Sequence, residues 1–281
     1  MNNIALTRRR FLAGTGLAAG AILAAATLPA WAKGRHLNSF GIQLYTVREQ
    51  MKKDVAATLE AIASFGYKEV EFAGYFGHSP AKIKSMLQDA GLTAPSAHIG
   101  LSNFDKNLTK TLDDALEAGH KFVTVPAMPK ILRNVEGYKK TADKFNVFGE
   151  EANKRGLRFG YHNHNFEFEV MDGITPYDLL LDRVDAKNMQ FTLDLYWVTK
   201  AGHSPLAYID KYPGRFEQCH VKDMDSKGNM VDVGDGIIDF PSIFAASKMA
   251  GFKHYYVEKD RTENSLLTAQ RSAVYLKKLT F

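Results

Sequence analysis

Apolar and polar positions follow two different periods from residue 40 to the end of the chain. Short apolar runs, typical of buried strands, are each followed by a segment with apolar residues at helical spacing. Polar caps and glycines bound the helical segments; Asp54 precedes the first and Gly66 follows it. The expected strands are residues 40–45, 67–73, 92–99, 121–125, 156–168 with its exit loop, 189–196, 216–221 and 254–257. The expected helices are residues 55–65, 79–91, 105–118, 135–155, 176–185, 205–212, 241–250 and 265–279.

These segments make eight consecutive strand-then-helix units at a mean spacing of about 30 residues. Strands that alternate with helices in this way form parallel sheets through right-handed crossovers. Eight such units in about 240 residues predict an α/β fold of the closed (β/α)8 TIM barrel type. An open doubly wound sheet is the main alternative, but no glycine-rich phosphate loop follows the first strand. We expect a single barrel domain over residues 33–281.

The first 32 residues follow a different pattern, typical of an export signal. Residues 7–12 read Thr-Arg-Arg-Arg-Phe-Leu, a twin-arginine motif, and a weakly apolar run follows over residues 13–28. Ala30 and Ala32 fit the small-residue rule for cleavage. We therefore predict a cleaved twin-arginine signal peptide, a periplasmic protein and no stable membrane insertion after cleavage. An uncleaved membrane anchor is the alternative.

Charge and cysteine content narrow the classes of partner. The leader holds three arginines and no acidic residue, which leaves 33 basic and 31 acidic residues and a net charge of +2. This near-neutral balance argues against a nucleic-acid partner. Cys219 is the only cysteine, so an intrachain disulfide is excluded. A homo-oligomer is compatible with the sequence, which leaves the oligomeric state open.

Polar residues fall where the expected strands end. In a (β/α)8 barrel the active site lies at the carboxyl ends of the strands. Strand ends buried only for packing would be valine, isoleucine or leucine, because buried polar groups are costly unless they are paired or bind a metal. The polar strand-end residues are Gln43, Glu71, His98, His162 with His164, Asp194, His220 with Lys222, and Glu258.

One subset of these residues predicts a metal site. Asp194, His220 and Glu258 come from the sixth, seventh and eighth strands, and His162 on the fifth would complete the set. Two imidazoles and two carboxylates suit a divalent ion such as manganese, zinc, iron or cobalt. Each residue taken singly also fits a structural role, such as a hydrogen-bonded core histidine. His164 shares a strand face with His162 by two-residue alternation.

Other residues are candidates for catalysis or substrate binding. Lys222 is expected to be a donor or cation beside a substrate oxygen, and His98 a proton relay or a ligand of substrate hydroxyls. Glu167 lies just beyond His164 in the exit loop and, like it, could act as a base. Gln43, Glu71 and the aromatic face of Trp197 are expected to bind substrate.

Several short motifs together resemble the xylose isomerase-like TIM barrels, the sugar phosphate isomerase/epimerase group. The similarity spans the predicted mature chain, and the order and spacing of the motifs make it specific. The motifs are Ile42-Gln43-Leu44-Tyr45-Thr46, Val70-Glu71-Phe72, Ala97-His98, Tyr161-His162-Asn163-His164 with Glu167-Phe168, Asp194-Leu195-Tyr196-Trp197, His220-Val221-Lys222-Asp223, residues 234–240 and Val257-Glu258.

The resemblance implies a divalent metal held at the ends of strands five to eight, and a small sugar or keto-sugar as substrate. Many members carry a glutamate at the position of His162, and epimerases pair it with the glutamate at the position of Glu258. This chain departs from that pair, so His164 or Glu167 would have to supply the second base. The resemblance implies an isomerase or epimerase that abstracts an α-proton and forms an enediolate.

Three other functions remain open. A lyase or hydratase acting on keto-sugars or 3-keto-glycosides would use the same metal and base but lose a β-substituent. A sugar-binding barrel without catalysis would fit the altered fifth strand. A phosphodiesterase of the endonuclease type would need a cationic face, which the near-neutral charge does not favour.

Overall fold

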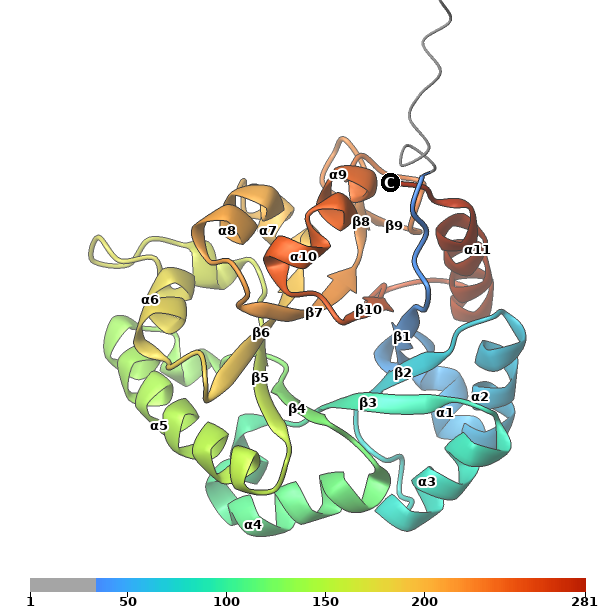
Figure 1. Ribbon diagram of the computed structural model, residues 1–281, viewed down its shortest axis with the longest axis horizontal. Helices are drawn as coiled ribbons and strands as arrows, with labels where there is room; N and C mark the ends of the chain where they lie inside the picture. Colours follow the sequence, from blue (N-terminus) through green and yellow to red (C-terminus); the bar gives the residue numbers. More distant parts are fainter. Residues whose placement is uncertain (1–33) are drawn as a thin grey trace, which may run out of the picture. The chain divides into compact units, whose positions relative to one another are not determined.

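The computed structural model describes residues 34–281, so the predicted signal peptide lies outside the described residues. Within them, parallel strands close into a barrel in the order β1-β10-β7-β6-β5-β4-β3-β2, which confirms the predicted (β/α)8 fold (Figure 1). The barrel strands are β1 (Gly41–Gln43), β2 (Glu69–Phe72), β3 (Thr93–His98), β4 (Phe122–Val125), β5 (Arg158–His162), β6 (Met189–Asp194), β7 (Phe216–Val221) and β10 (His254–Val257).

Helices surround this barrel on its outer side (Figure 1). They are α1 (Arg48–Lys53), α2 (Val55–Ser64), α3 (Pro80–Asp89), α4 (Leu101–Ala118), α5 (Val135–Lys154), α6 (Pro176–Arg183), α7 (Leu195–Lys200), α8 (Pro205–Lys211), α9 (Phe240–Ala245), α10 (Ser247–Ala250) and α11 (Ser265–Lys278). Because helices cover one face of the strands and barrel side chains the other, β4 and β6 are buried along their whole length. Over residues 34–281, we find no helix long and apolar enough to cross a membrane.

Helix starts follow the predicted caps. Asp54 begins α2 by accepting a hydrogen bond from the Ala57 amide, and Ser79 does the same for α3 through the Lys82 amide. Gly66 ends its segment with a φ of 96°, a left-handed conformation that glycine adopts without strain.

Several boundaries differ from the prediction, and three of the differences have a clear local cause. The sixth strand stops at Asp194 instead of Tyr196, because the Asp194 carboxylate accepts a hydrogen bond from the Trp197 amide and so begins α7. Helix α4, predicted over residues 105–118, begins four residues earlier, at Leu101. It follows Gly100, which has no side chain to form a cap that the sequence could signal. The predicted helix 241–250 is two short helices, α9 and α10, that meet at Ala246.

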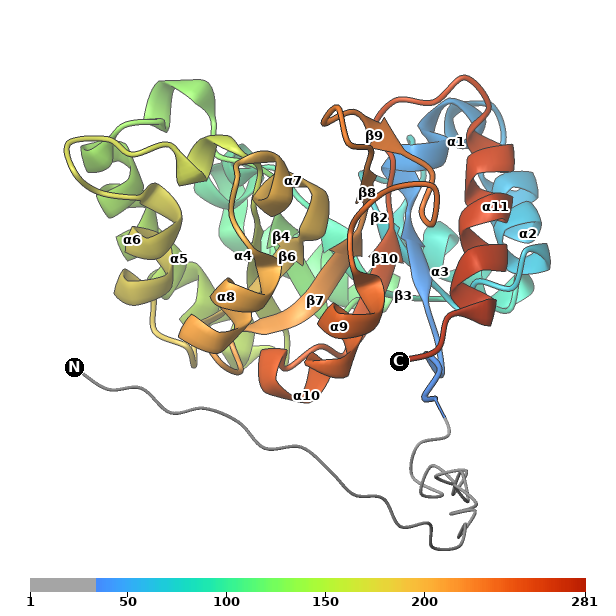
Figure 2. The same cartoon turned by 90° about the horizontal axis from the view of Figure 1, so that it is seen from above.

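A small hairpin absent from the sequence prediction follows β7. It pairs β8 (Asp223–Met224) with β9 (Met230–Val231) in antiparallel fashion. The Asp223 carboxylate anchors the next loop by accepting hydrogen bonds from the amides of Gly234 and Gly236. Figure 2 shows this hairpin at the same end of the barrel as α1. The hairpin therefore adds residues to the carboxyl end of the barrel, where the candidate site lies.

Candidate metal centre and cavity

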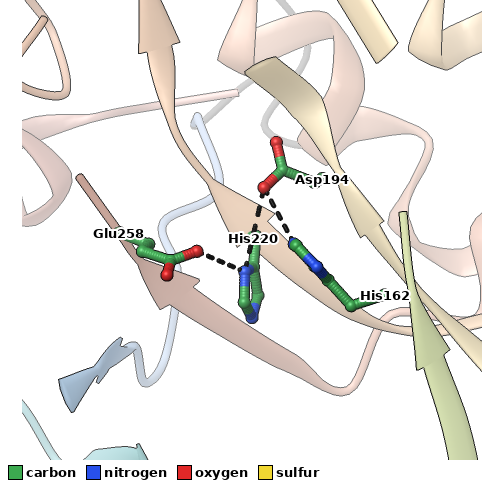
Figure 3. Close-up of side chains that lie close together, drawn as sticks. All are labelled: His162, Asp194, His220 and Glu258. Atoms are coloured by element: carbon green, nitrogen blue, oxygen red, sulfur yellow. Dashed lines mark hydrogen bonds and ion pairs between the residues drawn. The ribbon is translucent and has the colours of Figure 1, made fainter. Parts of the chain in front are cut away.

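The four predicted metal ligands meet at the carboxyl end of the barrel. His162 ends β5, Asp194 ends β6, His220 lies on β7 opposite Asp194, and Glu258 directly follows β10. One ligand atom from each lies within 4.8 Å of the others, and all four residues are buried. Figure 3 shows their side chains pointing toward one another from the ends of four separate strands. Closure of the barrel thus brings these residues together, as the sequence predicted.

His162 carries the clearest sign that this cluster fits a cation. Its Nδ1 lies 2.9 Å from the carbonyl oxygen of Pro126, which can only accept, so Nδ1 holds the proton. Burial, with smaller contributions from His220 and His98, lowers the pKa of His162 well below its usual value. The imidazole is therefore neutral, and the Nε2 lone pair faces the Oδ2 atom of Asp194 at 3.0 Å. Lys222 Nζ lies 3.2 Å from the same Oδ2 and satisfies that oxygen, whereas the Nε2 lone pair of His162 would be satisfied by a cation bound beside both atoms.

His220 is oriented from behind in the way that metal-binding imidazoles usually are. Its Nε2 lies 2.6 Å from Glu71 Oε2, and its Nδ1 lies 2.8 Å from Glu258 Oε2. Burial opposes protonation, but Glu71 and Glu258 raise the pKa of His220 to about 10, so it carries a proton unless a metal displaces it. When a metal displaces the Nδ1 proton, Nε2–H remains donated to Glu71, and the Nδ1 lone pair then faces the other candidate ligands.

Glu71 and Gln43 lie behind this imidazole rather than along the cavity. Glu71 accepts hydrogen bonds from Gln43 Nε2 at 2.7 Å and from Ser96 Oγ at 2.6 Å, and His98 Nε2 lies 3.2 Å away. Burial alone would raise the pKa of Glu71, but His98 and His220 lower it to about 2. Glu71 is thus a fixed anion. Its carboxylate contacts His220 and the side chains of Gln43, Ser96 and His98.

Lys222 lies among the acidic residues of the centre. Its side chain is 1% exposed, and its ammonium group contacts Asp194, Glu258 and Asp260. Burial would lower the pKa of Lys222, but these three carboxylates raise it further, so the lysine is charged. Lys222 is therefore a buried cation at the cavity wall and not a solvated loop residue.

His164 reaches the site from a loop, which corrects the predicted strand alternation with His162. The strand ends at His162, and His164 lies two residues beyond. Its ring still contacts that of His162, with centroids 4.9 Å apart, and lies between Phe166 and Trp197. Its buried Nδ1 has no hydrogen-bond partner among residues 34–281. Burial lowers the pKa of His164 well below its usual value, which keeps the ring neutral.

Glu167 supports this loop from outside the cavity. Its carboxylate accepts hydrogen bonds from the Tyr161 hydroxyl and, at 2.8 Å, from the His164 amide. Burial raises the pKa of Glu167 to about 7. The fully buried carboxylate does not line the cavity. Its contacts fix the loop that carries His164.

The centre opens into a cavity of about 1280 Å³. Of the sequence-predicted residues, His98, His162, His164, Trp197, Lys222 and Glu258 line it, whereas Gln43, Glu71, Glu167, Asp194 and His220 do not. Its rim includes the hairpin residues Gly228, Asn229 and Met230. The buried indole Nε1 of Trp197 has no partner in the described chain, so it is free to donate to a ligand oxygen.

Sequence reasoning missed Asp260, which lines the cavity and pairs with Lys222 at 2.7 Å. Its position in the loop directly after β10, two residues beyond Glu258, was an available signal, because loops that follow barrel strands line the carboxyl end of the barrel. Tyr75 was also missed; it lines the cavity from the loop after β2, where no periodic pattern extends.

Comparison with known proteins adds a family and a set of relatives. Residues 59–279 match the family model described as xylose isomerase-like TIM barrel. An inosose dehydratase from Clostridium beijerinckii is 28% identical over 130 residues, covering 40% of this chain and 43% of that protein. The chain spans about half the length of the curated Clostridium relatives that it matches.

Solved structures show the same barrel. A sugar phosphate isomerase/epimerase from Parabacteroides distasonis is 28% identical with a TM-score of 0.76, covering 85% of this chain and 93% of that one. The IOLI protein, solved with a bound zinc atom, is 16% identical with a TM-score of 0.67, covering 86% of this chain and 99% of that one. At that identity the second likeness supports the fold alone.

Proposed function

This chain belongs to the xylose isomerase-like TIM barrel family, and on that premise we propose that it is a divalent-metal-dependent lyase acting on a keto-sugar. The reaction would remove an α-proton and expel a β-substituent. The observation that carries this proposal is a cavity-facing base with a free nitrogen, His164 Nδ1, beside the His162–Asp194–His220–Glu258 centre. The inosose dehydratase relatives, whose name denotes loss of water, support an elimination.

In this proposal His162, Asp194, His220 and Glu258 hold the metal. The bound metal would polarise the substrate carbonyl and make the adjacent proton acidic. His164, neutral and unpartnered at Nδ1, accepts that proton. The electron pair left on carbon forms the new double bond as the β-oxygen departs. Lys222 donates a proton to the departing oxygen, so the products are an enone and an alcohol or water.

Surrounding residues position the substrate and the groups that move protons. Trp197 offers an aromatic face for a sugar ring and an indole N–H for a hydroxyl. His98 lies at the cavity wall, where it can contact a substrate hydroxyl. Glu167 serves as a positioning residue for the His164 loop. Gln43 and Glu71 contribute through His220, instead of the direct substrate contact expected from the sequence.

Isomerisation or epimerisation is the second candidate, supported by the name of the Parabacteroides structure. It would use the same proton abstraction, with the proton returned to carbon. Two-base epimerisation needs a second free base. The available carboxylate, Glu258, is already engaged by Lys222 at 2.9 Å and His220 at 2.8 Å. This engagement is why we place elimination first.

Metal analysis and a product assay test both parts of the proposal. Purified wild-type protein should contain about one divalent ion, and the His220→Ala and Glu258→Ala variants should lose it; full metal content in both would refute the centre. A panel of unphosphorylated keto-sugars in deuterated water then separates the reactions. Elimination releases water or an alcohol, whereas isomerisation places deuterium on carbon without release. Sugar binding without any proton exchange would refute both reactions.

We also propose that the protein is exported. The support is the twin-arginine motif of residues 7–12, which lies outside the described residues. Replacement of Arg8 and Arg9 by lysine should retain a tagged protein in the cytoplasm, whereas the wild type is found in the periplasm. Equal periplasmic amounts of the two forms would refute this route.

A further inference from the structure

Lys222 is held by three carboxylates, and only one of them lies outside the metal donor set. Its Nζ is 2.7 Å from Asp260 Oδ1, 2.9 Å from Glu258 Oε2 and 3.2 Å from Asp194 Oδ2. Glu258 and Asp194 are candidate metal ligands, whereas Asp260 lies beyond them at the cavity wall. The shortest of the three contacts is therefore the one that draws the ammonium group away from the centre.

The other two contacts use oxygens that face the metal position. Asp194 Oδ2 also lies 3.0 Å from His162 Nε2, and Glu258 Oε2 lies 2.8 Å from His220 Nδ1. A divalent cation bound by these nitrogens would share both oxygens with the ammonium group. Two positive charges a few ångströms apart repel each other strongly in a buried site. The location of the Lys222 charge therefore affects how tightly the centre binds a metal.

Asp260 is itself anchored well enough to set that location. Its amide donates to Met230 Sδ of the β8–β9 hairpin at 3.3 Å. The preceding Lys259 is fixed at both ends, by its amide to Thr46 Oγ1 at 3.1 Å and by its ammonium group to Asp232 at 2.7 Å. The backbone that carries the Asp260 carboxylate is thus held from both sides.

We propose that Asp260 is a positioning residue that holds the Lys222 ammonium group toward the cavity and thereby permits tight binding of the divalent cation. The arrangement also leaves Lys222 at the cavity wall, where a substrate oxygen would lie. This inference rests on the metal centre proposed above. The competing explanation is that the Asp260–Lys222 pair only ties the loops after β7 and β10 together.

A double-mutant cycle on metal affinity distinguishes the two explanations. The variants are Asp260→Asn, Asp260→Glu, Lys222→Met and the Asp260→Asn/Lys222→Met double variant. Each is titrated with Mn²⁺ in a competing-chelator assay, and its folding is checked by thermal unfolding. Asp260→Asn should weaken Mn²⁺ binding about tenfold, because the ammonium group then relies on the ligand oxygens alone. Asp260→Glu should restore affinity to within about threefold.

Lys222→Met gives the opposite sign and isolates the coupling. Removal of the competing charge should tighten Mn²⁺ binding about tenfold, and in that background Asp260→Asn should change affinity by less than about threefold. The inference would be overturned if Asp260→Asn weakened Mn²⁺ binding equally with and without Lys222. Unchanged Mn²⁺ affinity in the Asp260→Asn single variant would also overturn it. This second test does not require Lys222→Met to fold. Absence of Mn²⁺ binding by the wild type would instead refute the metal centre itself.

Discussion

Replacing Glu167 by glutamine should change how the stability of the protein depends on pH. Burial raises the pKa of Glu167 from 4.5 to about 7, against the hydrogen bonds from Tyr161 and His164 that favour the anion. Below about pH 4.5 the carboxyl is neutral in both the folded and the unfolded state. Between 4.5 and 7 only the unfolded state ionises, so stability falls as pH rises. Above 7 both states are ionised and the contribution no longer changes.

The size of the effect follows from the shift. A difference of about 2.5 pKa units corresponds to about 3 kcal/mol of unfolding free energy, lost between pH 4.5 and pH 7. Glu167→Gln cannot ionise and lacks this dependence. The free energy of unfolding of the wild type relative to Glu167→Gln should therefore fall by about 3 kcal/mol from pH 5 to pH 8.

This difference is measured by urea unfolding of the wild type and of Glu167→Gln at several pH values. Unfolding is followed by circular dichroism, and a chelator is present throughout. Glu117 on α4 is exposed, so Glu117→Gln is the matched control and should run parallel to the wild type. A constant offset between the wild type and Glu167→Gln across the whole pH range would refute the reasoning. That result would mean that Glu167 is ionised in the folded protein and that solvent reaches it.

Three further predictions follow from individual contacts. Glu71→Gln should weaken metal binding about 10- to 100-fold without loss of folding, because His220 Nε2 loses its carboxylate partner; unchanged affinity in a chelator competition would contradict this. Trp197→Phe should raise KM about fivefold and leave kcat nearly unchanged, because the free indole donor is lost while the aromatic face remains; a fall confined to kcat would place Trp197 in the chemical step. Gly149→Ala should destabilise the fold by about 2 kcal/mol or more, because a Cβ would collide with the Asn188 carbonyl oxygen; a melting temperature equal to that of the wild type would show that α5 can shift.

The barrel could be predicted from the sequence because its signals are local. Each strand is a short apolar run, and helix caps such as Asp54 and Ser79 satisfy amides three residues away. The errors arose where the local signal was weak or ambiguous. Asp194 could end a strand or cap a helix, and it does both. The two-residue strands of the hairpin are too short for alternation to register.

The cluster of candidate metal ligands could also be predicted from the sequence. His162, Asp194, His220 and Glu258 each stand at a strand end, and the closed barrel brings strand ends together regardless of their separation along the chain. The prediction that His164 shares a strand face with His162 is wrong, because His164 lies on the loop after the strand. Its proximity to His162 nevertheless holds.

The order of strands and helices and the residue types at the strand ends can be read from the amino-acid sequence. What each polar group faces depends on how the strands and loops pack against one another. Gln43, Glu71 and Glu167 look like site residues in the sequence, yet their side chains are turned to His220 and to the His164 loop. Asp260 and the hairpin gained their place at the cavity through contacts across the barrel rim. Such contacts join residues far apart in the chain, and no local pattern of hydrophobicity encodes their direction.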